Sequence, residues 1–144
     1  MILHAGCLAW RRDGAWAGVL VTGPSGVGKS DLALRLMSRG WRLVADDRAV
    51  VWRSGDALFA AAAPPLAGLV EARGLDILHV AARALTPVRL VVDCLPQGRT
   101  PERLPEPELR EIEGVRLPAI AVNALEASAT VKLEMALARQ GRLV

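Results

Sequence analysis

The sequence lacks the features that mark membrane-spanning and secreted chains. Its longest apolar stretches, such as residues 19–21 and 57–63, are far shorter than a membrane span and are bounded by polar, charged, Pro or Gly residues. The first four residues lack the basic-then-apolar form of a signal peptide. We therefore expect a cytoplasmic protein with no membrane partner.

Cysteine and clustered basic residues are also scarce. Cys7 and Cys94 are the two cysteines, and they form no C-x-x-C pair, so no zinc or redox motif is visible. We expect both to be reduced, semi-buried thiols. The formal net charge is only +3, and no run of Lys and Arg reaches the length of a nucleic-acid-binding patch. These features predict an ordinary solvated surface and no nucleic-acid partner.

Internal repeats and low-complexity linkers are absent as well, so the chain reads as a single domain over residues 1–144. At 144 residues it is long enough to bury a sizeable core. Hydrophobic residues make up 52% of the sequence, which excludes a disordered chain.

One motif organises what is present. Residues 23–30 read G-P-S-G-V-G-K-S and match G-x-x-x-x-G-K-S, the phosphate-binding P-loop pattern. An apolar segment suited to a buried strand, residues 17–22, precedes it, and a helical pattern over residues 31–39 follows it. The predicted nucleotide-binding residues are Gly23, Pro24, Ser25, Gly26, Val27, Gly28, Lys29 and Ser30.

The spacing of this P-loop explains its chemistry. Gly23, Gly26 and Gly28 let the backbone turn its N–H groups toward phosphate oxygens, and the following helix adds unpaired N–H groups. Lys29 is expected to reach the β- and γ-phosphates, and the Ser30 hydroxyl is expected to ligate Mg²⁺. The sequence therefore predicts a site for a nucleoside triphosphate with its magnesium ion.

Carboxylates at two strand ends are candidates to support Mg²⁺ beside this site. Asp46 and Asp47 end a predicted strand over residues 41–45, and ligand crevices of α/β sheets lie at the carboxyl ends of strands. One is suited to hold Mg²⁺ through water and the other to act as a base. Asp93, which closes a second buried strand over residues 87–93, resembles the acid that supports Mg²⁺ in many P-loop proteins.

The remaining segments carry weaker signals. Residues 2–10 read as a strand that forms a hairpin across Asp13-Gly14 with the P-loop strand, and the local pattern alone favours His4 as a core residue. Residues 94–113 are rich in Pro, Glu and Arg and predict a mobile or functional loop, from which Arg99 or Arg103 could approach a phosphoryl group.

The last predicted element is a helix with no expected chemistry. Asn123 is predicted to cap it, with Glu126 at the third helical position as in a capping box, and Gly141 to end it. Its predicted core face consists of Leu125, Ala129, Leu133, Ala136 and Leu137.

Taken together, these segments resemble the catalytic domain of the HPr kinase/phosphorylase family. Three motifs carry the resemblance: the P-loop, R-G-W-R-L-V-A-D-D at residues 39–47, and E-A-R-G-L-D-I at residues 71–77. The second is similar to the family's R-G-H-R-L-V-A-D-D, with Trp41 in the histidine's place, and the third to E-I-R-G-L-G-I, with Asp76 in place of glycine. The likeness covers residues 4–77 well and the remainder weakly.

This resemblance implies a fold and an activity. The fold is an α/β P-loop domain with a mixed sheet, of the type shared by HPr kinases and phosphoenolpyruvate carboxykinases. The activity is phosphorylation of a serine on the phosphocarrier protein HPr with ATP and Mg²⁺, which the family reverses by phosphorolysis, and the family is hexameric. The family's N-terminal domain is not represented, so the chain reads as a minimal form.

The resemblance also implies roles for single residues. Asp47 accepts the serine proton, His4 supports that aspartate, and Lys29 is the P-loop lysine. Glu71 joins Ser30 as a ligand of Mg²⁺, and Asp93 is then not the metal acid.

Two late motifs of the family are weak in this sequence. The arginine of its Y-D-R-x-G motif is best matched by Arg103, within Glu102-Arg103-Leu104. The R-P-G-R loop linked to dephosphorylation is not recognisable, so kinase activity is the direction expected. Two alternatives stay open: a P-loop kinase that acts on a small molecule, and a nucleotide-sensing module without transfer activity.

Overall fold

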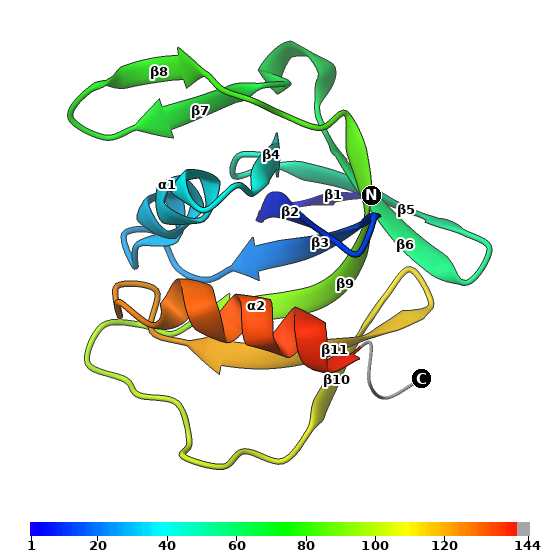
Figure 1. The fold of residues 1–144 in the computed structure, drawn as a ribbon, viewed down its shortest axis with the longest axis vertical. Helices are drawn as coiled ribbons and strands as arrows, with labels where there is room; N and C mark the ends of the chain where they lie inside the picture. The colour runs from blue at the N-terminus through cyan, green and yellow to red at the C-terminus, as the bar shows by residue number, and fades with distance from the viewer. Residues whose placement is uncertain (141–144) are drawn as a thin grey trace.

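Strand β3 (Ala15–Thr22), which leads into the P-loop, lies in the middle of a curved mixed sheet in this computed structural model (Figure 1). The structure describes residues 1–140. Over that range the main sheet has nine strands, seven of them in the order β1-β5-β6-β9-β3-β2-β4. Strand β11 extends the sheet by pairing with β9, and β10 pairs with β11. The sequence thus predicted the mixed α/β architecture correctly.

The elements follow the chain in a simple order. The strands in the first half of the chain are β1 (Ile2–Leu3), β2 (Gly6–Arg12), β3, β4 (Arg42–Ala45), β5 (Ala49–Ser54), β6 (Ala57–Ala62) and β7 (Leu69–Ala72). The later strands are β8 (Asp76–His79), β9 (Leu85–Cys94), β10 (Glu108–Ile112) and β11 (Val115–Val122). The helices are α1 (Lys29–Ser38), a 3-10 turn at Pro64–Leu66 and α2 (Ala129–Gln140).

Alternation along β3 sends its side chains into two separate cores. Val19 and Val21 belong to a cluster that both helices cover, whereas Leu20 belongs to a cluster on the opposite face. Strand β9 divides its apolar side chains in the same way, because it runs parallel to β3 and beside it. Both strands are therefore fixed from two sides, which holds the P-loop that follows β3.

The sheet is strongly curled around the second core. Strands β4 and β6 are in contact although β9, β3 and β2 stand between them in the pairing order. Cys7 lies within this core and Cys94 in the helix-covered one, and burial raises the pKa of their thiols to about 12 and about 11. Both thiols are free, as predicted, but they are more deeply buried than the semi-buried positions expected. Neither helix within residues 1–140 has the length and apolar character needed to cross a membrane.

Three local predictions were wrong. His4 does not lie on a strand beside β3: it occupies a bend between β1 and β2, and β1 pairs with β5 instead. Residues 108–112, assigned to a loop, form β10, because both Glu113 and Gly114 take the positive φ of a tight hairpin turn and bring β10 onto β11.

The third error concerns the start of the last helix. Helix α2 begins at Ala129, so Asn123 and Glu126 do not form a capping box. The Asn123 side chain instead accepts the backbone N–H of Leu125, and Glu126 pairs with Lys132. Leu125 is 54% exposed and not part of the core face, whereas the other four predicted core residues of the helix are buried. Gly141 lies outside the described residues.

Candidate active site

The P-loop has the backbone that phosphate binding needs. Gly23, Gly26 and Gly28 all have positive φ, at 144°, 80° and 104°, and α1 begins directly after them at Lys29. The Lys29 Nζ atom donates a hydrogen bond to the carbonyl of Gly23 at 2.6 Å, which holds the ammonium group across the loop. The strand, loop and helix predicted from the motif are confirmed.

Gly23 is the glycine at which an added side chain would come closest to backbone. A Cβ atom there would lie 2.6 Å from the carbonyl oxygen of Cys94, which is backbone and cannot rotate away. We expect Gly23→Ala to lower the free energy of unfolding by about 2 kcal/mol or more, measured by urea denaturation. Gly55 is the control, because it also has positive φ but an added Cβ meets nothing within 4 Å. Equal losses for Gly23→Ala and Gly55→Ala would contradict the clash.

The P-loop forms one wall of a cavity of about 570 Å³. The opposite walls come from the turn after β4, from the β7–β8 hairpin and from the loop between β11 and α2. The lining residues are Ser25, Gly26, Gly28, Lys29, Ser30, Asp31, Leu34, Asp46, Asp47, Glu71, Arg73 and Leu125. The fold therefore brings together the three sequence motifs that the resemblance rested on.

A second cavity of similar size does not carry this chemistry. It has a volume of about 530 Å³ and lies between α2 and the β2–β3 hairpin, where Trp10 and Trp16 line it. Asp13 is the carboxylate among its lining residues, and no part of the P-loop reaches it. Residue chemistry and not volume therefore identifies the first cavity as the candidate site.

Asp47 and His4 form a pair at the edge of this site. The His4 Nε2 atom lies 3.3 Å from an Asp47 carboxylate oxygen, and the two side chains are 64% and 59% exposed. Asp47 has a φ of 66°, a left-handed conformation that aspartate tolerates better than most residues. Because the carboxylate is accessible and paired with an imidazole, it is placed to accept a proton from an incoming group.

Asp46 differs from its neighbour in both contacts and burial. Its carboxylate accepts the backbone N–H of Glu71 at 3.1 Å, which ties the turn after β4 to β7. Partial burial raises the pKa of Asp46 above its ordinary value, and the Glu71 N–H opposes that rise. The resemblance assigned the base to Asp47 and no role to Asp46. In the structure the Asp46 carboxylate is bonded to β7, whereas the exposed Asp47 carboxylate lines the cavity.

Ser30 and Glu71, the predicted magnesium ligands, both line the cavity. Across residues 1–140 no three His, Cys, Asp or Glu side chains gather as a complete metal site. This donor set fits Mg²⁺ bound together with a nucleotide, because that ion takes one or two protein oxygens and completes its shell with phosphate oxygens and water.

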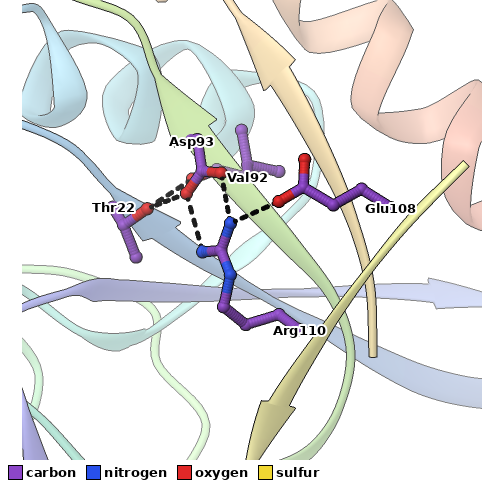
Figure 2. Close-up of polar contacts among 5 residues, drawn as sticks. All are labelled: Thr22, Val92, Asp93, Glu108 and Arg110. Atoms are coloured by element: carbon purple, nitrogen blue, oxygen red, sulfur yellow. Dashed lines mark hydrogen bonds and ion pairs between the residues drawn. The ribbon is translucent and has the colours of Figure 1, made fainter. Parts of the chain in front are cut away.

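Asp93 is engaged elsewhere, in a polar network at the carboxyl ends of β3 and β9 (Figure 2). Arg110 of β10 donates to both of its carboxylate oxygens, at 3.0 and 2.7 Å, and Thr22 donates to one of them at 2.7 Å. Glu108 accepts a further bond from Arg110 at 3.0 Å. Asp93 is not among the cavity-lining residues, whereas Asp47 and Glu71 are.

The Asp93–Arg110 pair makes stability depend on pH. The Arg110 guanidinium lowers the pKa of Asp93, and so does the Thr22 hydroxyl. A lowered pKa means that the folded state favours the ionised carboxylate, so this stabilisation is present above the ordinary value of about 3.9 and is lost as the pH falls through the folded value. We expect Asp93→Asn to lower the free energy of unfolding by about 1 kcal/mol at pH 7.

The measurement is urea unfolding of wild type and Asp93→Asn between neutral pH and about pH 3, the range spanned by that loss. The gap between the two proteins should shrink as the pH drops below about 4. Asp56→Asn, in the exposed β5–β6 turn, is the control. A gap that stays constant over the whole pH range would contradict the ion pair.

The structure does not bring Arg103 to the cavity. It lies exposed on the long connection between β9 and β10 and is not among the lining residues. Arg73 and Leu125 do line the cavity, although the sequence predicted no site role for Arg73 and a core position for Leu125. A β-hairpin places Arg73, and a non-helical loop places Leu125, so neither signal was visible in local periodicity.

Comparisons with known proteins agree with this geometry. The sequence profile described as the HPr Serine kinase C-terminal domain matches residues 14–140. The chain is 48% identical over 83 residues to the HPr kinase/phosphorylase of Lacticaseibacillus casei strain BL23, a match that covers 52% of this chain and 26% of the relative. It is 52% identical over 64 residues to the protein of the same name from Exiguobacterium sp., covering 44% and 21%. The chain therefore spans about a quarter of the length of these curated relatives.

A solved structure agrees over nearly the whole chain. The Hpr(Ser) kinase/phosphatase from Coxiella burnetii superposes with a TM-score of 0.81 at 26% identity, covering 99% of this chain and 97% of that one. The fold class expected from the sequence and the family resemblance are both confirmed.

Proposed function

Because the chain belongs to the HPr Serine kinase C-terminal domain family, we propose that it transfers the γ-phosphoryl group of ATP to a serine of an HPr-type phosphocarrier protein. The observation that carries this proposal is the convergence of P-loop, Asp47 and Glu71 on one cavity. The names of its relatives support the acceptor. The proposal includes Mg²⁺ as cofactor, a cytoplasmic location and a homo-hexamer.

The proposed role of each residue follows from its position in the cavity. Lys29 and the P-loop N–H groups would bind the phosphates and offset their charge, and Ser30 and Glu71 would hold the ion. Mg²⁺ supplies neutralisation of charge on the β- and γ-phosphates when it is bound. Phosphoryl transfer needs this positioning and charge neutralisation more than covalent help from the protein.

Asp47 is the proposed base. It accepts the proton of the serine hydroxyl as the serine oxygen bonds to the γ-phosphorus and the bond to the β-phosphate oxygen breaks, which leaves phosphoserine and ADP. His4 acts as a positioning residue, because its imidazole is 3.3 Å from one Asp47 oxygen and leaves the other to the serine. Arg103 remains a proposed catalytic cation that requires movement of its loop.

The proposal is tested by steady-state release of ADP from ATP and Mg²⁺, with and without purified HPr-type proteins. We expect ADP release to depend on one such protein and to stop when its acceptor serine is replaced by alanine. ADP release that depends on a metabolite would favour the small-molecule kinase, and ATP binding without any release would favour the nucleotide-sensing module.

A further inference from the structure

The cavity has an apolar side that phosphate binding does not explain. Among its lining residues within the described chain, Leu34 and Leu125 are the two large apolar side chains, and the others are polar, charged or glycine. Leu125 is 54% exposed and belongs to neither core. A single exposed leucine is common in proteins, so its support by the surrounding residues decides whether it has a function.

Leu125 is held in place from both sides of its backbone. Its N–H donates to the side-chain oxygen of Asn123 at 3.1 Å. The Arg35 guanidinium, on α1, donates to the carbonyl of Ala124, and at 3.2 Å to the carbonyl of Glu126. These two carbonyls flank Leu125. Arg35 therefore ties the loop between β11 and α2 to helix α1.

The leucine side chain then lies directly on the P-loop. A Cβ atom built on Gly28 would come within 2.6 Å of Leu125 Cδ2, so the absence of a side chain at Gly28 is what makes room for it. The contact joins the apolar side of the cavity to the phosphate-binding loop, with no gap between them.

Leu34 extends the same apolar side along α1. It is half-buried and lies four residues after Ser30, so both side chains are on one face of the helix, about 6 Å apart along its axis. The charged residues Asp46, Asp47 and Glu71 come from other elements of the cavity wall. A ligand whose phosphates sit on the P-loop can therefore extend a flat apolar group over the two leucines.

We propose that Leu125 and Leu34 form the subsite for the base and sugar of the nucleotide, with Arg35 as the residue that positions Leu125. The inference rests on the proposed function, because it needs a nucleotide on the P-loop. Burial of a leucine under a nucleobase removes apolar surface from water, which phosphate groups cannot do.

The test compares ATP with inorganic tripolyphosphate, which has the phosphates but no base or sugar. Calorimetric titration of the full chain in Mg²⁺ gives both dissociation constants. We expect Leu125→Ala to raise the constant for ATP roughly tenfold and to leave the constant for tripolyphosphate unchanged. Leu125→Met, which keeps an apolar side chain of similar size, should bind ATP as the wild type does.

Leu109→Ala is the matched control, since Leu109 is 61% exposed on β10 and outside the cavity. It should change neither constant, and the urea midpoint of Leu125→Ala should match that of the wild type. Equally weaker binding of both ligands would mean that Leu125 only stabilises the P-loop. Unchanged binding of ATP would mean that the base lies elsewhere. Either result overturns the subsite.

These results are distinguishable from failure of the proposed function. A wild-type chain that binds ATP no more tightly than tripolyphosphate overturns the subsite and leaves phosphoryl transfer intact. A chain that shows the Leu125 effect but transfers no phosphate to HPr retains the subsite and loses the kinase. Binding of neither ligand overturns both.

Discussion

The Asp47→Asn variant is expected to transfer the phosphoryl group of ATP about a thousandfold more slowly than the wild type. Asparagine cannot accept the serine proton, yet it has nearly the same size as aspartate and tolerates the φ of 66° at this position. The fold and the P-loop should therefore be preserved. Nucleotide affinity is expected to change little, because Lys29 and the loop N–H groups hold the phosphates.

The measurement is single-turnover transfer to the acceptor, with nucleotide binding measured in parallel. Asp13→Asn is the matched control, because Asp13 is also an exposed turn aspartate with positive φ, at 52°, but lies outside the cavity. It should transfer at the wild-type rate. Transfer by Asp47→Asn at a rate within tenfold of the wild type would rule out the base assignment.

Lys29→Met should lower the rate of transfer by a factor of about a hundred to a thousand. Methionine keeps the length and apolar stem of the side chain but removes the ammonium group that would contact the phosphates as charge develops on them. The bond from Nζ to the Gly23 carbonyl at 2.6 Å is also lost. We therefore expect weaker ATP binding in addition to slower transfer, by about tenfold.

The chain offers a close control for that substitution, because its only other lysine is Lys132. Lys132, on α2, forms an exposed pair at 2.8 Å with Glu126 of the preceding loop, and it is not among the cavity-lining residues. Lys132→Met should leave both ATP affinity and transfer unchanged. Similar losses in the two variants would show that general charge, and not the P-loop lysine, determines activity.

Local sequence signals predicted the elements that depend on neighbouring residues. The P-loop strand and helix, the Asp13-Gly14 hairpin and the end of α1 before Gly40 all follow from short motifs and glycine conformations. Strand β10 was not predicted because its own composition resembles a solvated loop. Its extended conformation depends on pairing with β11. The start of α2 was misplaced because Asn123 bonds to the next residues without continuing into a helix.

The site residues also fall into those that local motifs predict and those that depend on distant contacts. The P-loop, Asp46, Asp47 and Glu71 were identified from motifs, and the structure places all of them around one cavity. The predicted core position of Leu125 was wrong because the position of this residue depends on Arg35. Arg35 is 90 residues earlier in the chain and donates hydrogen bonds to the carbonyls on either side of Leu125. Asp93 looked like a metal acid until its contact with Arg110, 17 residues later, was known. Contacts of this range leave no local pattern in a sequence.

The central claim is that this cavity moves a phosphoryl group from ATP to a protein serine. The most direct measurement is a single-turnover reaction with γ-labelled ATP, Mg²⁺ and a purified HPr-type acceptor, followed by mapping of the label by mass spectrometry. We predict label on one serine of the acceptor with the wild-type chain and none with Asp47→Asn. Label recovered only as inorganic phosphate or on a small molecule, with ATP binding intact, would contradict the account.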